Sequence, residues 1–457
     1  MNKTIAAIAT APGNAGISII RVSGDEAFSV CDRIFRSVRG VKLSESAGFR
    51  AYYGHIYDND EMIDEVIALV YRNPKSYTGE DTVEISCHGG MVITKRILDI
   101  IIKNGATPAS PGEFSMRAFI NGKMDLSKAE AVMDMISAKN EYASRVSGLA
   151  IGGSISRSIC DTRETLLNDI SFIEAALDDP EHIDISEFSE DFSKRINKMI
   201  KDIENLKKRY ATASVLSEGV KTVIVGRPNA GKSSLINALC GRDLAIVTDI
   251  AGTTRDVLSA QAVIEGITFL FTDTAGIRDT DNKVEKIGVT RSISEAESAD
   301  LILFVIDSSD ILTEDDYKIY SYIKNKKCIL IYNKTDLAPA VSEEAISESF
   351  GDIPVVRTCI DKGEGVEELK DKLASMFHDG SMIENDQVII VNARQMSEIE
   401  EALDALKSVK QSIEDGFSED IWSIDLYAAY EALGRITGDT ADDDVINNIF
   451  SKFCMGK

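Results

Sequence analysis

The chain has 457 residues and a formal net charge of −25, because 50 Lys and Arg residues stand against 75 Asp and Glu residues. This length favours about three domains, and a hydrophobic fraction of 44% with a charged fraction of 27% excludes wholesale disorder and fibrous repeats. No stretch approaches the run of about 18 apolar residues that a transmembrane helix needs. The apolar run before Pro12 is too short for a secretory leader, so we expect a cytoplasmic protein.

The cysteine pattern and the negative net charge limit which cofactors and binding partners we expect. The seven cysteines are scattered and contain no C-x-x-C pair, which argues against a disulfide framework and a cysteine-based zinc site. Constitutive nucleic-acid binders usually carry net positive charge, because phosphate contacts supply most of their affinity. We therefore expect this chain to bind RNA only through a local basic patch or with a partner's help.

Residues 1–123 alternate short β-type runs with turn residues. The runs are 4–10, 16–24, 66–72 and 81–90, each bounded by Gly, Pro, Asn or Asp. One helical pattern interrupts them over 91–103, where isoleucines recur on one face. This zone predicts a compact α+β domain.

The next zone changes to long helical patterns, which return at the end of the chain. Helices are expected from about residue 125, again over 192–210, and along one amphipathic stripe near the C-terminus: Met396, Ile399, Leu403, Leu406, Val409 and Ile413. Between them, residues 218–379 alternate apolar runs (222–226, 267–274, 301–307, 327–334 and 354–358) with helical patterns, as in a mostly parallel sheet covered on both faces. We therefore expect one all-α domain, built from 124–217 and 380–457, with an α/β domain inserted into it.

The inserted segment contains a phosphate-binding loop. Residues 226–233 match G-x-x-x-x-G-K-[ST], follow an apolar strand and open an amphipathic helix. In this context the backbone N–H groups of the loop wrap the phosphates and the helix N-terminus adds its positive dipole end. Lys232 is expected to reach the outer phosphates and the Ser233 hydroxyl to ligate Mg²⁺. The contacts predicted here are Asn229, Ala230, Gly231, Lys232, Ser233 and Ser234.

Three further segments indicate a guanine nucleotide. The first follows the strand 267–272 and puts a carboxylate near the metal; it comprises Asp273, Thr274, Ala275 and Gly276. The second ends the run 327–334 and comprises Asn333, Lys334, Thr335 and Asp336. Asp336 can accept the N1–H and N2–H₂ hydrogen bonds that guanine offers and adenine does not. The third is a switch loop, and the nucleotide contacts predicted in and before it are Thr248, Asp249, Ile250, Ala251, Gly252, Thr253 and Thr254. Together the segments resemble the translation-factor-related branch of P-loop GTPases.

Two positions depart from the pattern of that branch. Ile277 stands where Ras-like proteins have the glutamine that orients the attacking water. An apolar side chain cannot do this, so Arg278, Glu285 or Arg291 could do it instead, unless all three belong to a solvated loop face. The last nucleotide loop, usually Ser-Ala-Lys, reads Cys359, Ile360 and Asp361 here. Backbone contacts to the guanine oxygen could persist there, whereas the side-chain roles are open.

The whole chain resembles the MnmE (TrmE) family of bacterial and organellar tRNA-modification GTPases. The resemblance rests on the order of the zones and on the stretches 11–24, 76–81, 88–90 and 111–119 with the C-terminal Cys-x-Gly-Lys of residues 454–457. It implies modification of the wobble uridine at carbon 5 by an aminomethyl or carboxymethylaminomethyl group, together with a flavin-containing partner, MnmG (GidA). It also implies a homodimer formed through an N-terminal domain that resembles folate-binding domains and holds 5-formyl- or methylene-tetrahydrofolate.

The resemblance also implies roles for particular residues. Folate contacts would come from Arg21, Glu80, Lys123 and Lys457, which taken singly would be ordinary surface charges. Cys454 would be a nucleophile or proton-transfer group, or else a buried inert cysteine beside the pocket. The G domains would pair and use K⁺, with Asn229, Thr248, Ile250 and Thr253 as its ligands. Ser233 and Thr254 would ligate Mg²⁺, and Glu285 would orient the water.

An alternative function, from a different functional class, is that of a GTPase switch for ribosome assembly or membrane remodelling without one-carbon chemistry. Ribosome-assembly GTPases usually carry a basic RNA-binding domain, and membrane remodelling would need a basic amphipathic or apolar paddle. Neither feature is evident in this acidic sequence. For tRNA, we expect the partner to supply most phosphate contacts, with help from the basic stretch 194–209.

Overall fold

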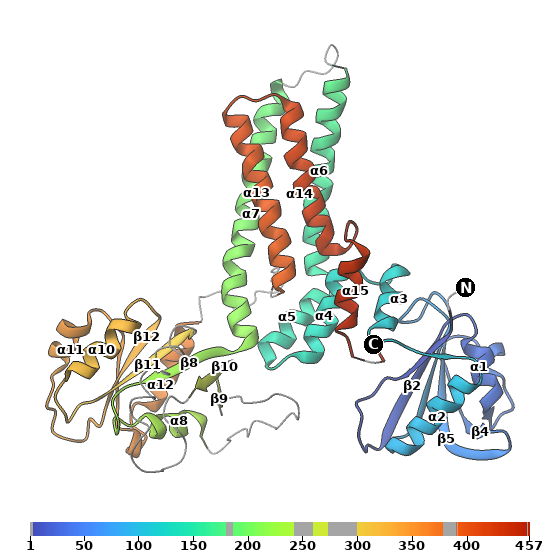
Figure 1. Ribbon diagram of the computed structural model, residues 1–457, viewed down its shortest axis with the longest axis horizontal. Helices are drawn as coiled ribbons and strands as arrows, with labels where there is room; N and C mark the ends of the chain where they lie inside the picture. Colours follow the sequence, from blue (N-terminus) through green and yellow to red (C-terminus); the bar gives the residue numbers. More distant parts are fainter. Residues whose placement is uncertain are drawn as a thin grey trace. The chain divides into compact units, whose positions relative to one another are not determined.

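The computed structural model describes residues 3–179, 186–241, 259–272, 299–377, 390, 392–454 and 456–457 (Figure 1). Contacts between Cα atoms divide the chain into two compact units. The first unit comprises Met1–Met133, Ala150–Lys201 and Ser397–Lys457, and the second comprises Asp134–Leu149 and Asp202–Met396. The three domain ranges expected from the sequence remain a prediction, because this division follows a different criterion.

The first unit contains a seven-stranded sheet in the order β3-β4-β5-β6-β2-β1-β7. Its pairs are antiparallel except the β1–β7 pair. The helices α1 (Ala27–Ile34) and α2 (Met91–Lys103) share one apolar core with the sheet. The strands are β1 (Ile5–Ile8), β2 (Ile17–Ser23), β3 (Phe35–Ser37), β4 (Arg50–Asp58), β5 (Glu61–Tyr71), β6 (Thr82–His88) and β7 (Thr107–Pro108).

The α+β prediction for this zone is confirmed, but several of its elements were missed. The expectation of a single helix was wrong, because α1 and α3 (Glu113–Ile120) also form, as does the one-turn helix η1 (Leu43–Glu45). Both α-helices have eight residues, too few for a periodic pattern to stand out. Strand β4 was missed because its sequence, RAYYGHIYD, contains no continuous apolar run.

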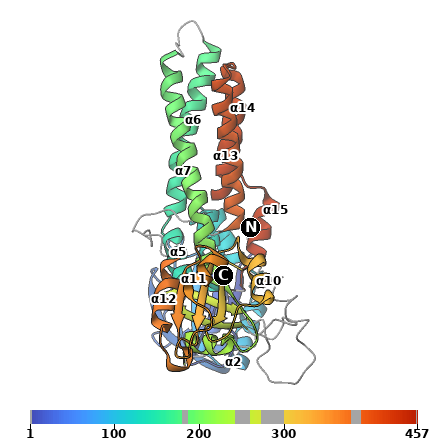
Figure 2. The same cartoon turned by 90° about the vertical axis from the view of Figure 1, so that its left-hand side faces the viewer.

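Long helices make up most of the rest of the first unit. In both views α6, α7, α13 and α14 run side by side (Figures 1 and 2). The C-terminal stripe falls on α13, where Ile399, Leu406 and Val409 are fully buried, so that helix is confirmed. The helices are α4 (Leu126–Ser137), α5 (Glu141–Ile151), α6 (Ser154–Asp178), α7 (Ser186–Glu218), α13 (Ala393–Glu414), α14 (Glu419–Thr437) and α15 (Asp443–Ser451); α4, α5, α7 and α13 have residues in both units.

The second unit contains a six-stranded sheet in the order β13-β12-β11-β8-β10-β9. Every neighbouring pair is parallel except β10–β9. Separate apolar cores cover its two faces, one including α8 and α12 and the other α10 and α11. The strands are β8 (Val220–Val225), β9 (Ser259–Ile264), β10 (Ile267–Thr272), β11 (Leu301–Asp307), β12 (Cys328–Asn333) and β13 (Val355–Thr358), and the helices are α8 (Lys232–Cys240), α10 (Glu314–Ile323), α11 (Glu343–Phe350), η2 (Ile360–Lys362) and α12 (Val366–Ser375).

The mostly parallel α/β architecture is therefore confirmed, and five of its strands fall on the five expected apolar runs. The antiparallel edge strand β9 was missed, because SAQAVI mixes polar and apolar residues. Within the described ranges, no helix is both long and apolar enough to span a membrane.

Candidate nucleotide site and tail pocket

The nucleotide motifs meet at one edge of the six-stranded sheet. Strands β8, β11, β12 and β13 are parallel, so their carboxyl ends lie at the same edge. Ligands of open α/β sheets bind in the crevice outside these ends. The phosphate loop follows β8, the Asn333–Asp336 motif begins at the end of β12, and the Cys359 loop follows β13.

The phosphate loop is held in its shape by Lys232, the first residue of α8. Its Nζ donates to the carbonyl oxygens of Gly226 at 2.9 Å and Arg227 at 2.7 Å. The ammonium therefore links the end of the loop to its first two residues. Asn229 adopts a left-handed conformation with φ of 65°, which Asn tolerates better than most residues. Ser233 follows Lys232 in the first turn of α8 and is exposed, which suits a metal ligand at the phosphate end of the helix.

Asn333 joins three loops of the site through one side chain that is 3% exposed. Its Nδ2 donates to the carbonyl oxygen of Ala230 in the phosphate loop at 2.9 Å. Its Oδ1 accepts from the hydroxyl of Thr358 at 3.0 Å and from the backbone N–H of Ile360 at 3.4 Å. Both ends of the amide are therefore occupied, and the base-binding loops keep a fixed register against the phosphate loop.

Asp336 has the electrostatics of a base-binding carboxylate. The Cys359 thiol and the Lys362 ammonium, whose Nζ lies 3.2 Å from Asp336 Oδ2, hold the pKa of Asp336 below its usual value. Burial and the neighbouring Asp336 raise the pKa of Cys359, so this residue is a neutral thiol that can donate. At neutral pH Asp336 is thus ionised and presents acceptor oxygens, as guanine N–H groups require.

The remaining members of the site divide into described and undescribed residues. Thr335 donates from its N and Oγ1 to the carbonyl oxygen of Thr358, both at 3.3 Å, while Ser234 and Asp361 are exposed. The other predicted nucleotide, metal and water-orienting residues lie outside the described residues, so their roles remain predictions: Thr248, Asp249, Ile250, Ala251, Gly252, Thr253, Thr254, Asp273, Thr274, Ala275, Gly276, Arg278, Glu285 and Arg291.

In the first unit, Arg21 joins the sheet to the C-terminal tail, residues 454–457. Its Nε and Nη2 lie 2.9 and 2.8 Å from Oε1 of Glu84 on the neighbouring strand. Its Nη1 donates to the carbonyl oxygen of Gly456 at 3.3 Å. The guanidinium also lies 5.1 Å from the ring centroid of Tyr77 and 5.5 Å from that of Phe114.

The tail adds a second cation to this cluster of side chains around Arg21, which we call the tail pocket. Lys457 Nζ lies 5.4 Å from the centroid of the same Tyr77 ring. Burial, and then the charge of Arg21, lower the pKa of Lys457, against the opposing effect of Glu84. Gly456 has φ of 90°, and a Cβ there would collide with the carbonyl of Ile8 at the end of β1, so only glycine allows the tail to lie there.

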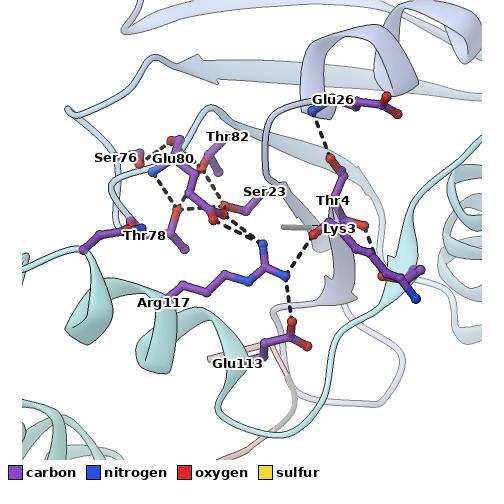
Figure 3. A network of polar contacts seen from close by, with 12 residues as sticks. Lys3, Thr4, Ser23, Glu26, Ser76, Thr78, Glu80, Thr82, Glu113 and Arg117 are labelled. Atoms are coloured by element: carbon purple, nitrogen blue, oxygen red, sulfur yellow. Dashed lines mark hydrogen bonds and ion pairs between the residues drawn. The ribbon is translucent and has the colours of Figure 1, made fainter. Parts of the chain in front are cut away.

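Glu80 is held in a polar network with Ser23 and Arg117 (Figure 3). Its two oxygens lie 3.2 and 3.1 Å from Nη1 of Arg117, and one also accepts from the Ser23 hydroxyl at 2.8 Å. Arg117 in turn donates to the Lys3 carbonyl at 2.9 Å and to Glu113 at 2.7 Å. The proposed contact between Glu80 and a pterin stays a prediction, and a ligand would have to share these oxygens.

Lys123 and Cys454 are the other two residues that the resemblance assigns to folate binding or to the reaction. Lys123 Nζ donates to the Pro74 carbonyl oxygen at 3.0 Å. Cys454 is exposed, so the alternative of a buried inert cysteine is wrong. Its carbonyl oxygen accepts from the backbone N–H of Lys457 at 3.3 Å, which closes the tail into a turn.

Sequence reasoning missed Glu84, Tyr77 and Phe114 as members of this pocket. Tyr77 and Phe114 lie inside stretches that carried the family resemblance, but nothing marked them as neighbours of Arg21. The signal for Glu84 was strand pairing, because β2 and β6 are antiparallel neighbours with Arg21 directly opposite Glu84. Opposite charges at such a position stabilise each other.

A phosphate loop and an Asn-Lys-Thr-Asp motif at the carboxyl edge of one parallel sheet define the second unit as a P-loop GTPase fold. Comparisons with known proteins specify the family. The family model of the GTP-binding protein TrmE N-terminus matches residues 4–123, and that of the MnmE helical domain matches residues 126–454.

Relatives match over nearly their whole length. The tRNA modification GTPase MnmE of Lachnoclostridium phytofermentans is 45% identical over 99% of both chains. The proteins of the same name from Alkaliphilus oremlandii and Clostridioides difficile are 43% and 42% identical, each over 100% of both chains. The chain therefore belongs to the MnmE family of tRNA modification GTPases.

Proposed function

We propose that this chain is the GTP-hydrolysing subunit of an enzyme that adds an aminomethyl or carboxymethylaminomethyl group to carbon 5 of the wobble uridine in tRNA. Its reaction partner would be the flavoprotein MnmG, and its one-carbon donor a 5-formyl- or methylene-tetrahydrofolate. Residues 1–123 would bind the folate, 218–379 would hydrolyse GTP, and 124–217 with 380–457 would form the helical domain. A cytoplasmic location follows from the tRNA substrate.

The observation that carries this proposal is the pocket of Arg21, Tyr77 and Lys457. Two cations beside one aromatic ring suit a ligand that combines an aromatic ring system with carboxylates, and a folate has both. Reduced folate supplies the one-carbon unit when bound. The exposed Cys454 thiol lies in the same tail and is available as a nucleophile or proton-transfer group.

At the nucleotide site, each residue of the predicted set would have a distinct task. Lys232 would neutralise the outer phosphates, Asp336 would select guanine, and Ser233 with Thr254 would hold Mg²⁺, which supplies counter-charge to the phosphates. Ligand oxygens from Asn229, Thr248, Ile250 and Thr253 would suit K⁺, a hard monovalent cation. Glu285 would orient the attacking water in place of the absent glutamine.

The outer face of the seven-stranded sheet supports a homodimer. Ile17, Tyr53 and Ile67 are 64, 52 and 49% exposed, and Tyr53 lies opposite Ile67 on the adjacent strand. Exposed apolar side chains gathered on one face favour an interface. Arg21 belongs to the outward-facing set of β2, because Ser18, Ile20 and Val22 alternate with it and are buried. The dimer face and the folate pocket would therefore share the same side of the sheet.

Calorimetric titration with 5-formyltetrahydrofolate tests the pocket. Arg21→Met should weaken binding about tenfold or more, because a charge-assisted contact to a carboxylate is lost. Arg50→Met is the matched control, since Arg50 is an exposed arginine on β4 of the same sheet, and it should bind like the wild type. Equal affinity of Arg21→Met and wild type would exclude this pocket as the folate site.

The cation requirement is tested by measuring GTP hydrolysis with K⁺ replaced by Na⁺. Hydrolysis should be markedly faster in K⁺, because the cation would offset charge that develops between the β- and γ-phosphates. Asn229→Lys should abolish the difference by putting an ammonium where the cation would bind. Equal rates in both salts for the wild type would remove K⁺ from the proposal.

A further inference from the structure

Arg227 directs its side chain away from the phosphate loop and onto the segment that follows β11. Each of its three kinds of guanidinium nitrogen has a different acceptor. Nε lies 3.0 Å from Oδ2 of Asp316, Nη1 lies 3.0 Å from Oδ2 of Asp310, and Nη2 donates to the carbonyl oxygen of Ile311 at 3.0 Å. A three-pronged contact fixes the direction of the guanidinium, which a lysine could not do.

Asp316, which accepts from Nε of Arg227, is buried and also caps the N-terminus of α10 (Glu314–Ile323). Its side chain is 1% exposed, and the same Oδ2 accepts from the backbone N–H of Thr313 at 2.9 Å and from the Thr313 hydroxyl at 3.1 Å, forming the capping box of α10. A buried carboxylate needs a cationic partner, and Arg227 supplies it. Arg227 therefore ties the phosphate loop to the start of α10.

The backbone of Arg227 faces the opposite way and serves the nucleotide site. Its carbonyl oxygen accepts from Lys232 Nζ at 2.7 Å and from the backbone N–H of Ala230 at 3.3 Å. One residue thus anchors the loop to the rest of the fold through its side chain and holds the phosphate-binding lysine through its backbone. A displacement of Arg227 would displace the partner of Lys232.

The other end of the same segment is tied to the guanine motif. Lys334 Nζ lies 2.6 Å from Oδ2 of Asp307, and the Ser308 hydroxyl donates to the Lys334 carbonyl oxygen at 3.0 Å. Burial acts to raise the pKa of Asp307, but hydrogen bonds from Lys334 and Ser309 outweigh it and hold that pKa below its usual value. Residues 307–316 therefore contact the phosphate loop at one end and the base motif at the other.

We infer that residues 307–316 form a brace between the phosphate and guanine subsites, and that Arg227 and Asp316 are positioning residues for the phosphate loop. The inference rests on this loop being the GTP site. The brace touches the two subsites through separate ion pairs, Arg227–Asp316 and Lys334–Asp307. Cutting the first pair should therefore weaken phosphate binding and leave base selection unchanged.

The test compares the dissociation constants of GDP, GTP and ITP, measured with the full chain by competition against a fluorescent guanine nucleotide. Arg227→Met keeps the apolar stem and removes the three donor nitrogens, and it should weaken the binding of all three nucleotides about tenfold. The GTP-to-ITP affinity ratio should stay at the wild-type value, because inosine differs from guanosine only in the base. A generally loosened fold would lower that ratio too.

Two further variants separate the ion pair from a general loss of stability. Asp316→Asn keeps the shape of the cap, and its effect should not add to that of Arg227→Met in the double variant. Asp310→Asn is the matched control, since Asp310 is 57% exposed and its pair with Arg227 should change affinity less than twofold. Arg227→Lys keeps the positive charge on a single nitrogen, which cannot reach all three acceptors, and should give an intermediate affinity. It also carries the test if Arg227→Met does not fold.

Three outcomes would overturn the brace. These are nucleotide affinities within twofold of wild type in folded Arg227→Met or Arg227→Lys, full additivity of the Arg227 and Asp316 effects, and a fall in the GTP-to-ITP ratio. Lys232→Ala distinguishes these from failure of the site assignment. If Lys232→Ala bound GDP like the wild type, the loop itself would not be the phosphate site.

Discussion

The nucleotide site and the tail pocket use opposite ways of bringing charged groups together. At the nucleotide site, short loops at the ends of adjacent parallel strands carry the motifs, and a single buried amide, Asn333, holds three of these loops in register. The tail pocket gathers Arg21, Glu84 and Lys457 from the two ends of the chain. The first site is built from segments close to the strand ends in the sequence, whereas the second also depends on the tail lying against β1.

This difference has an energetic consequence. Loops fixed by strand ends cost little further entropy to order, because the sheet already holds both of their ends. Cys454, Gly456 and Lys457 belong to no strand or helix, so their position must be maintained by individual contacts, chiefly the Gly456 carbonyl on Arg21 and the Lys457 ammonium beside Tyr77. Substitutions at the nucleotide site should therefore alter selectivity sharply, and substitutions around the tail should act through stability and pH.

The largest expected effect is a change of base selectivity on Asp336→Asn. The variant replaces one acceptor oxygen with an N–H donor, which suits xanthine, whose C2 carries a carbonyl oxygen where guanine has an amine. The preference for GTP over XTP should fall by about 10⁴-fold, the cost of leaving such buried polar groups unpaired. Competition binding with both nucleotides measures the ratio.

The control for that experiment is Asp352→Asn, which alters an exposed carboxylate of the same unit. It should keep the wild-type preference. If Asp336→Asn still preferred GTP by the wild-type factor, Asp336 would not recognise the base. The expectation that substitutions at the nucleotide site alter selectivity would then be wrong.

A smaller effect, on stability alone, is expected for Arg117→Met in the first unit. Arg117 and Glu80 are 8 and 11% exposed, and removing one partner of a buried pair costs about 3–5 kcal/mol. Denaturant unfolding should show this loss, while GDP affinity stays unchanged. Arg96→Met supplies the contrast, because Arg96 and its partner Glu61 are 45 and 62% exposed and the pair should contribute less than about 1 kcal/mol. Equal losses from both variants would contradict the buried network.

The same contrast explains what the sequence could predict. The phosphate loop and the Asn333–Asp336 motif were predictable because contiguous residues at strand ends have their geometry set by the sheet. The contact of Asn333 with Ala230 was not predictable, since it depends on the register of β8 and β12 through β11. In the first unit, Arg21 and Lys457 could be named by resemblance. The buried ion pair of Glu80 with Arg117 could not be predicted, because it follows from where α3 carries Arg117.

The smallest expected effect is a pH dependence that comes from Lys457. Burial and Arg21 lower its pKa below the ordinary 10.5, so the folded chain binds fewer protons than the unfolded chain between the lowered value and 10.5. Stability therefore rises with pH across this window, and the tail contributes least below it, where Lys457 is charged beside Arg21.

Lys457→Met should flatten this rise, while Lys452→Met, which changes an exposed lysine five positions earlier, should keep it. Unfolding free energies measured across the window for the three chains decide the matter. Parallel curves for wild type and Lys457→Met would mean that the ammonium does not share the pocket with Arg21.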